Sequence, residues 1–249
     1  MTRSPIPKVL STFREHEVAT LLMGGQACIL YGAAEFSRDI DFCVLSSEDN
    51  LERLQCALSG LEAEPIAVPP FERAYLERGH AVHFRAHHPE ASGLRVDIMS
   101  KLRGVDPFGE LWERRTTLEL PGHGALDVLS LPDLVQSKKT QRDKDWGMIR
   151  RLGEASYARD EIPSAERANF WLRELRTPEL LLECAVRFPA QANEVARARV
   201  ATLAAVDRDE PGVRSALAAE EALEQERDRQ YWAPLRAELE DLRRERRSP

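Results

Sequence analysis

The chain has 249 residues, of which 43% are hydrophobic and 31% charged, and its formal net charge is −7. A chain of this length forms one domain or two. Its net negative charge argues against nonspecific binding of nucleic acid over the whole surface, but it does not argue against a local basic site. The N-terminus lacks an apolar signal segment, and no run reaches the ~18 apolar residues of a membrane helix, so we expect no membrane partner and a cytoplasmic protein. The four cysteines have no metal-ligand spacing and are expected to be reduced.

Hydrophobic periodicity predicts alternating helices and strands in the first half of the chain. A Pro-rich segment over 63–72 is expected to be a loop. In chain order the predicted elements are a helix over 7–18, a strand over 19–24, a helix over 26–32, a strand over 38–45, a helix over 46–61, strands over 80–86 and 94–100, a helix over 108–115, and strands over 116–120 and 126–130.

From residue 130 onward we find helical periodicity without a convincing strand. The predicted helices cover 131–152, 163–174, 178–187, 190–206 and 212–247. The fold class is therefore predicted as α+β (α/β): a mixed β-sheet flanked by helices over residues 1–129, followed by a helical C-terminal domain over residues 130–249.

Two aspartates stand one residue apart in the strand predicted over 38–45. Alternate side chains of a strand share a face, so Asp39 and Asp41 point one way while Ile40 and Phe42 point into the core. The strand over 94–100 repeats this design with Asp97. If the two strands are neighbours, three carboxylates meet on one patch without an evident matching cation. Such a cluster suits Mg²⁺, or two such ions about 3.5–4 Å apart. The alternative is a solvated strand face on which each aspartate is hydrated or paired with a surface arginine.

Gly24 and Gly25 fall where the strand over 19–24 gives way to the helix over 26–32. Glycines let the backbone approach a ligand closely, and the start of a helix offers free amides to an anion. A simple tight turn is the alternative. Because the pair precedes D-x-D with a helix between them, the combination indicates a phosphate-binding turn beside a metal-binding strand.

At these residues the chain resembles the polymerase-β-type nucleotidyltransferase superfamily, in the minimal bacterial branch that includes the AbiEii-like toxins. The pattern of that branch is a Gly-Gly or Gly-Ser turn, a helix, a strand with D-x-D and a third acid on a later strand. It is matched here by Gly24-Gly25, Asp39-Ile40-Asp41 and Asp97. The resemblance covers roughly residues 18–152 and is more specific in its first half.

The residues just ahead of D-x-D depart from the pattern of the branch. Many members carry R-x-T-x-D-I-D, where this chain has "EFSRDID" over 35–41. Ser37 stands for the threonine, whereas Glu35 replaces the basic residue, and Arg38 is the candidate to make the triphosphate contact in its place. Glu35 also favours an alternative function, a catalytically inactive binding or regulatory module that acts through its helical tail.

The resemblance implies a Mg²⁺- or Mn²⁺-dependent enzyme that moves a nucleoside monophosphate from an NTP to an acceptor hydroxyl and releases pyrophosphate. Asp39, Asp41 and Asp97 would bind the metal, Asp97 would accept the proton of the hydroxyl, and Gly24 and Gly25 would hold the β- and γ-phosphates. The acceptor would be a tRNA or another RNA, a protein, or a small molecule such as an aminoglycoside. A toxin of this branch would also have a partner antitoxin.

The segment 131–152 carries cations on its apolar stripe. On a single helix Lys138 and Arg142 fall within the stripe and Lys139 lies toward its flank, although Lys and Arg are rarely buried unless paired. Relatives carry a comparable lysine in a similar helix, so the resemblance implies that Lys138, together with Arg142, binds the triphosphate, with Lys139 as the other option. Side chains that bend out to solvent, or a helix break near Thr140, are the alternatives that need no ligand.

Four histidines gather in and just after the strand over 80–86: His80, His83, His87 and His88. We expect them to be structural or solvated, with the option that one approaches the aspartates from a neighbouring strand. The C-terminal stretch "RAELEDLRRERR" is expected to be a solvated helix with internal salt bridges.

Overall fold

The structure is a computed structural model of the chain, and it describes residues 4–34, 36–120 and 124–247. Proximity of Cα atoms divides the chain into two compact units. The sheet unit comprises Met1–Leu30, Glu35–Ser137 and Tyr231–Pro249, and the helical unit comprises Tyr31–Ala34 and Lys138–Gln230. The domain ranges 1–129 and 130–249 remain a prediction.

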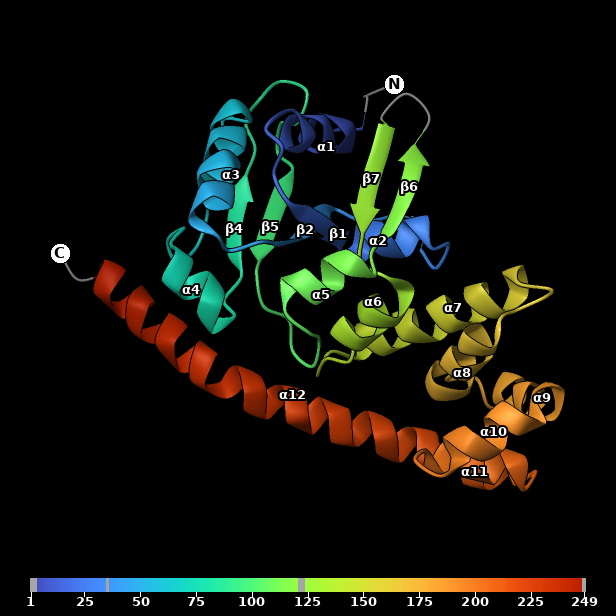
Figure 1. The fold of residues 1–249 in the computed structure, drawn as a ribbon. Coiled ribbons are helices and arrows are strands. Elements are labelled where there is room, and N and C mark those ends of the chain that lie inside the picture. The colour runs from blue at the N-terminus through green and yellow to red at the C-terminus, as the bar shows by residue number, and fades with distance from the viewer. Residues whose placement is uncertain (1–3, 35, 121–123, 248–249) are drawn as a thin grey trace. The chain divides into compact units, whose positions relative to one another are not determined.

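In the described residues, the sheet unit is built on one mixed sheet of seven strands (Figure 1). Its order is β3-β4-β5-β2-β1-β7-β6, in which β2–β5 and β1–β7 are parallel neighbours and the other neighbours are antiparallel. The mixed sheet flanked by helices, predicted from the sequence, is confirmed. The strands are β1 (Thr20–Met23), β2 (Asp39–Val44), β3 (Glu64–Pro65), β4 (Val82–Arg85), β5 (Arg95–Met99), β6 (Thr116–Leu120) and β7 (Gly124–Val128).

Six helices and the end of a seventh accompany the described part of this sheet. The helix α2 lies beside β1 and β2, and α1 lies beside α3 (Figure 1). β3 lies within the segment expected to be a loop, and it escapes a periodicity argument because it is two residues long. The helices are α1 (Ile6–Glu15), α2 (Gly24–Leu30), α3 (Glu48–Gly60), α4 (Arg73–Arg78), α5 (Phe108–Glu113), α6 (Leu131–Ser137) and the last part of α12 (Glu210–Arg247).

The core of the sheet unit follows from strand alternation. On β2 the side chains of Ile40, Phe42 and Val44 are buried, as the sequence predicts, and Val96 and Ile98 of β5 are buried beside them. Each large apolar side chain that is buried in this way stabilises the fold by about 1.5–3 kcal/mol. These residues fix β2 in register beside β5, so the opposite faces of the two strands are fixed as well.

The helical unit contains α7 (Asp143–Arg159), α8 (Ala165–Glu174), α9 (Pro178–Arg187), α10 (Pro189–Ala196), α11 (Val200–Val206) and the first part of α12. Two predicted helices are each divided in the structure. The segment 190–206 is divided between α10 and α11 at Arg199, whose backbone is extended and whose buried side chain donates to the carbonyls of Leu172 and Leu175.

The predicted single helix over 131–152 is wrong, and the alternative with a break near Thr140 is confirmed. α6 ends at Ser137 and α7 begins at Asp143. The hydroxyl of Thr140 donates to Asp145 at 2.6 Å, and the indole of Trp146 donates to the carbonyl of Thr140 at 2.7 Å. These side-chain bonds satisfy backbone and carboxylate groups that a continuous helix would need to pair otherwise.

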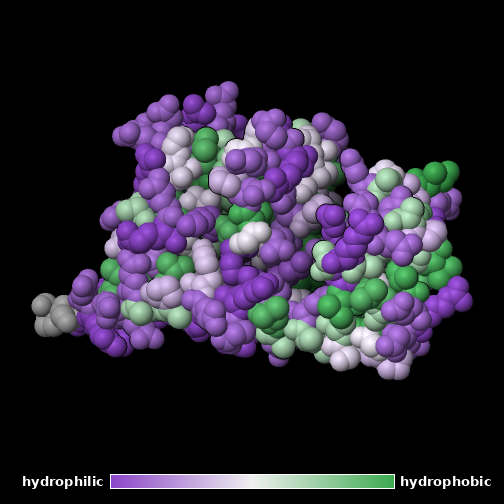
Figure 2. Space-filling model, turned by 60° about the horizontal axis from the view of Figure 1, so that its bottom comes forward, coloured by the Kyte–Doolittle hydropathy of each residue, from purple (hydrophilic) through white to green (hydrophobic). Residues whose placement is uncertain are grey.

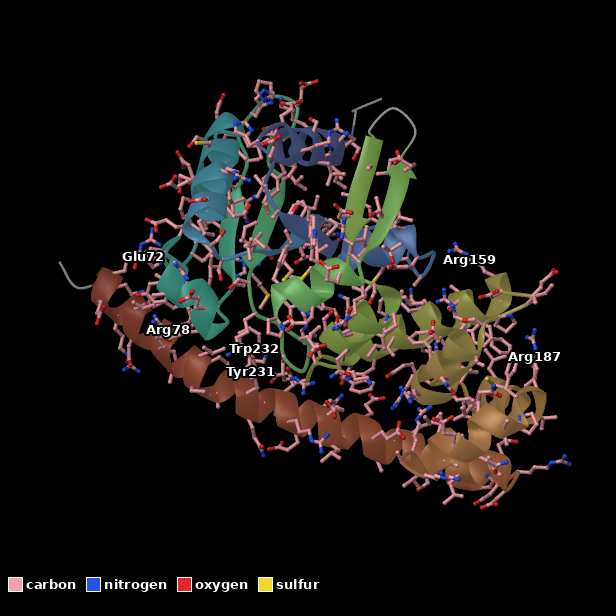
Figure 3. The ribbon with its side chains drawn as sticks, in the orientation of Figure 1. Glu72, Arg78, Arg159, Arg187, Tyr231 and Trp232 are labelled. Atoms are coloured by element: carbon pink, nitrogen blue, oxygen red, sulfur yellow. The ribbon has the colours of Figure 1, made fainter. Side chains whose placement is uncertain are left out.

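The sequence predicted that the end of α12 is a solvated helix, but in the structure Glu238 of this segment contacts two residues near the end of α4. Glu238 accepts from Nε2 of the fully buried His80 at 2.6 Å and from Arg78 at 2.8 Å. Arg78 on α4 and Tyr231 on α12 are labelled in Figure 3. The expected internal salt bridges are present too, for example between Arg244 and Asp241 at 3.1 Å.

Hydrophilic residues cover most of the face drawn in Figure 2. Exposed large hydrophobic side chains include Phe36 and Ile66 in the sheet unit and Val186 and Val200 in the helical unit. None of the helices in the described residues combines the length and the apolar character needed to cross a bilayer.

Candidate functional site

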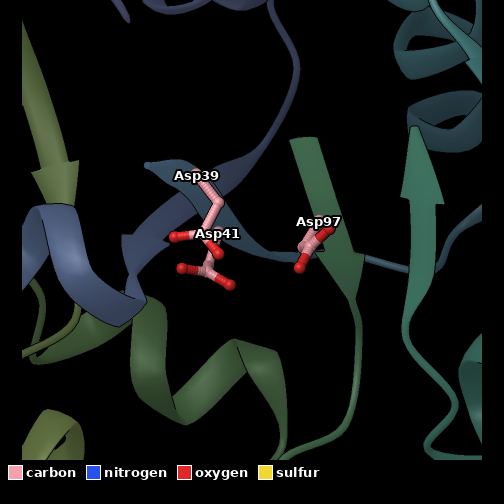
Figure 4. A group of neighbouring side chains, drawn as sticks. All are labelled: Asp39, Asp41 and Asp97. Atoms are coloured by element: carbon pink, nitrogen blue, oxygen red, sulfur yellow. The ribbon is translucent and has the colours of Figure 1, made fainter. Parts of the chain in front are cut away.

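Three aspartates from two neighbouring strands converge on one face of the sheet (Figure 4). β2 and β5 are parallel, and their register places Asp41 directly beside Asp97, with Asp39 two residues earlier on β2. One carboxylate oxygen from each of the three lies within 4.8 Å of the other two. Asp97 is buried, whereas Asp39 and Asp41 are half-buried. The predicted meeting of these side chains therefore occurs, and the sequence alternation is the reason for it.

The carboxylate of Asp39 is held by a neighbouring hydroxyl. Oγ of Ser37 donates to Oδ1 of Asp39 at 2.9 Å. A Cβ atom on Gly25 would lie 2.3 Å from that same Oγ, so Gly25 leaves the space in which the Ser37 hydroxyl sits. Ser37 and Gly25, both predicted to bind nucleotide, thus contact each other at the edge of the aspartate cluster.

Gly24 is in the left-handed region, with φ of +66°. A Cβ atom at this position would lie 1.9 Å from Oδ2 of Asp41 and 2.4 Å from its Cγ. Two requirements therefore coincide here, a backbone conformation that glycine adopts readily and a close approach to a carboxylate. The sequence predicted a close approach of this turn to a ligand, and in the structure the turn closely approaches Asp41.

Asp97 is bound by two side chains that the sequence analysis did not pair with it. Nε of Arg95 donates to Oδ1 of Asp97 at 2.7 Å, and Nδ1 of His83 lies 2.9 Å from the same oxygen. His83 is opposite Asp97 in the β4–β5 pairing, and Arg95 shares the face of Asp97 on β5. The expectation of a cluster without a matching cation is therefore wrong at Asp97. The signal was present in the alternation of Arg95 and Asp97, because residues two apart on a strand share a face.

The surroundings keep Asp97 ionised. Burial alone would raise the pKa of this carboxyl group, but the hydrogen bonds and charges of His83 and Arg95 outweigh burial and hold the pKa below its ordinary value. The pKa of Arg95 is raised, chiefly by its hydrogen bond to Asp97 and further by attraction to Asp97, Asp39 and Asp41. Arg95 therefore interacts electrostatically with the whole cluster.

The donor set fits a hard divalent cation. All three ligands would be carboxylate oxygens, which suit Mg²⁺ and Mn²⁺. Oxygens bound to one Mg²⁺ ion at about 2.0–2.1 Å lie about 2.9 Å apart when adjacent and about 4.2 Å apart when opposite. The upper limit of 4.8 Å on the present spacing of the three oxygens lies close to this range. Because Gly24 has no Cβ, the carboxylate of Asp41 occupies space beside the turn that any other residue would fill, and this position keeps it in the cluster.

The predicted phosphate-binding cations lie in different surroundings. Arg38 is exposed, one residue before β2. In the helical unit, Lys138 and Arg142 both contact Asp145, at 3.4 and 2.7 Å, and Lys139 contacts Glu174 at 2.9 Å. Glu35 lies outside the described residues. The nucleotide-binding roles of these cations remain a prediction.

The histidines behave differently from one another. His83 reaches the aspartate cluster from the neighbouring strand, as the sequence analysis allowed. His80 instead binds Glu238, Nε2 of His87 lies 3.9 Å from Glu64, and Nδ1 of His88 accepts from the amide of Glu90. Among the described residues, the group able to hold a metal ion is the aspartate cluster and includes no histidine.

Comparison with known proteins gives little beyond this geometry. No family model matches the chain, and no curated protein matches its sequence. Two similar solved structures are both from Helicobacter pylori. JHP933 shares 14% identity over 94% of each chain with a TM-score of 0.39. A candidate nucleotidyltransferase shares 13% identity over 91% of this chain and 94% of its own, with a TM-score of 0.38. Likeness at this level says nothing about function.

Proposed function

We propose that the chain is a divalent-metal-dependent nucleotidyltransferase. The observation that carries the proposal is the convergence of Asp39, Asp41 and Asp97 from two parallel strands, with oxygens within 4.8 Å of one another. Clustered carboxylates repel, by about 4 kcal/mol for a pair at ~4 Å and an effective dielectric of about 20. Asp97 is buried beside Asp39 and Asp41, and a divalent cation bound among them would offset their repulsion more fully than a single protein cation does.

The proposed reaction joins an acceptor hydroxyl to the α-phosphorus of an NTP. The oxygen–phosphorus bond forms as the bond from the α-phosphorus to the bridging oxygen breaks, so pyrophosphate leaves and the hydroxyl proton passes to a carboxylate, for which Asp97 is the predicted acceptor. When bound at Asp39 and Asp41, Mg²⁺ or Mn²⁺ would offset the phosphate charge and favour loss of the hydroxyl proton. The turn at Gly24-Gly25, together with Ser37, is proposed to meet the phosphates.

The acceptor and partners are proposals that rest on the resemblance. A tRNA or another RNA, a protein hydroxyl and a small molecule are the acceptor classes, and an antitoxin would be the partner of a toxin of this kind. Lys138 and Arg142 keep their predicted role in binding the triphosphate.

The test is transfer of label from each α-labelled NTP, with Mg²⁺ or Mn²⁺, to bulk tRNA and to protein. Asp39→Asn and Asp41→Asn should each lower transfer at least about 100-fold, because each removes a charged ligand held in place. Asp49→Asn, which changes an exposed carboxylate on α3, is the matched control and should leave transfer unchanged. Transfer that persists in both site variants would contradict the proposal.

A second function is favoured by one observation. Arg95 and His83 both bind the carboxylate of Asp97, so side chains of the protein itself compensate its buried charge. A non-catalytic binding module that holds no metal would need such compensation. Thermal melting separates the two: an enzyme of this kind should melt at a higher temperature with NTP and Mn²⁺, by mass action on the folded state. A melting temperature that no NTP or divalent ion raises would favour the module.

A further inference from the structure

A cation of the protein already occupies part of the aspartate cluster. Arg95 donates to Oδ1 of Asp97 at 2.7 Å, and in the β2–β5 register it stands beside Asp39. Its side chain is 41% exposed, whereas that of Asp97 is 10% exposed, so the guanidinium reaches the buried carboxylate from the rim. Arg95 is a single positive charge directly beside a site proposed for a doubly charged ion.

The carboxylates of Asp39 and Asp97 differ in what holds them. Asp39 accepts from the neutral hydroxyl of Ser37, which places no positive charge beside a metal ion. Asp97 is held by an ion pair with Arg95, and a metal ion bound to Asp97 would share that carboxylate with a like-charged neighbour. Like charges disfavour each other at this range, so metal binding at Asp97 is opposed and metal binding through Asp39 is not opposed to the same degree.

We propose that Arg95 is a positioning residue that competes with the divalent ion for Asp97: it orients this carboxylate and at the same time weakens metal binding by the cluster. This inference rests on the proposed function. The guanidinium of Arg95 keeps the Asp97 carboxylate ionised and in one orientation before a metal ion binds, so this ligand is already positioned. The same charge lowers metal affinity, so the ion that depends on Asp97 binds more weakly than one held through Asp39 and Asp41.

The two roles of Arg95 are separable by substitution. Arg95→Gln removes the charge, and at a separation of ~6 Å, even in the dielectric of water, loss of a unit charge should tighten binding of a divalent ion about tenfold. Arg95→Lys keeps the charge but loses the planar fork that holds Oδ1, so it should bind metal about as wild type does and transfer nucleotide more slowly. A residue that merely stabilised the fold would weaken metal binding in both variants.

The experiment is a titration with Mn²⁺, without nucleotide, of the full-length chain and its variants, with free Mn²⁺ followed by electron paramagnetic resonance. We expect Arg95→Gln to bind about tenfold more tightly than wild type. Arg73→Gln, which removes an exposed arginine paired with Glu77 on α4, is the charge-matched control and should bind as wild type does. Arg95→Met repeats the loss of charge with an apolar stem and guards against a folding defect peculiar to glutamine.

The outcomes separate this inference from the proposed function. Binding that is unchanged or weaker in Arg95→Gln and Arg95→Met, while wild type binds Mn²⁺, overturns the competition and leaves the metal site standing. If neither wild type nor the two charge-removing variants binds Mn²⁺, the proposed function fails and this inference fails with it. Nucleotide transfer that falls in Arg95→Gln although Mn²⁺ binds more tightly supports the positioning role.

Discussion

Replacement of Gly24 by alanine is predicted to disable the aspartate cluster while leaving the fold intact. The new Cβ would lie 1.9 Å from Oδ2 of Asp41, and ordinary contacts begin near 3.4 Å, so the carboxylate must retreat by their difference, about 1.5 Å. That shift is a large part of a Mg²⁺–oxygen bond of about 2.0–2.1 Å. A misplacement of about 1 Å costs roughly 100-fold in rate, so we expect at least that loss in nucleotide transfer. Affinity for Mn²⁺ should fall about 10-fold or more.

Gly93→Ala supplies the matched control for backbone strain. Gly93 also has a positive φ, +81°, but a Cβ there meets nothing within 4 Å. Both substitutions carry the left-handed penalty of about 1–2 kcal/mol. In a chain of this size each kcal/mol lowers the melting temperature by about 2–4 °C. Thermal melting and Mn²⁺ titration of both variants give the comparison. Mn²⁺ binding by Gly24→Ala that is as tight as binding by Gly93→Ala would contradict this prediction.

Three further predictions follow from contacts in the sheet unit. Ser37→Ala removes the donor to Asp39 and should lower Mn²⁺ affinity about tenfold, measured by calorimetric titration; unchanged affinity would show that the hydroxyl does not orient the carboxylate. Asp97 has a lowered pKa in the fold, so its share of stability is complete above the ordinary carboxyl range and is lost as the pH falls through the lowered value. Asp97→Asn should accordingly reduce the fall in unfolding free energy below about pH 4, read from urea unfolding at several pH values, and an identical acid dependence would argue against the ion pair. His80→Ala removes a fully buried ring that binds Glu238 and should lower the unfolding free energy by about 2 kcal/mol or more, whereas a loss near zero would mean that the end of α12 is held by other contacts.

The aspartate cluster could be predicted from sequence because it depends on a short-range rule. Alternation along β2 and β5 decides which face each side chain takes, and the buried apolar residues on the other face leave one choice of orientation. The prediction required the two strands to be neighbours, and the structure shows that they are, in a parallel pairing.

The partners of the cluster were harder to predict, because alternation specifies a face and not a rotamer. Alternation along β5 puts Arg95 on the face of Asp97, yet whether its side chain turns to Asp97 or to solvent depends on burial and on His83 from another strand. The role of Gly24 was likewise only partly predictable from sequence. A turn that needs glycine was expected, but the closeness of Asp41 is a tertiary distance.

The break between α6 and α7 shows a limit of periodicity. Leu134 and Ile149 are both buried, as one apolar stripe would require, although they belong to different helices. Periodicity counts residues along the sequence as if the helix were continuous, so it does not register the five residues between the two helices, 138–142. The hydrogen bonds of Thr140 and Asp145 that mark the interruption involve polar side chains that periodicity ignores.

Anomalous scattering from crystals grown with Mn²⁺ and a nonhydrolysable NTP analogue would locate the metal directly. A manganese peak bonded to oxygens of Asp39 and Asp41, with the triphosphate on the same ion and Asp97 beside it, is the expected result. Manganese bound elsewhere, or no manganese peak at Asp39 and Asp41 when nucleotide is present, would contradict metal-dependent catalysis by these three residues.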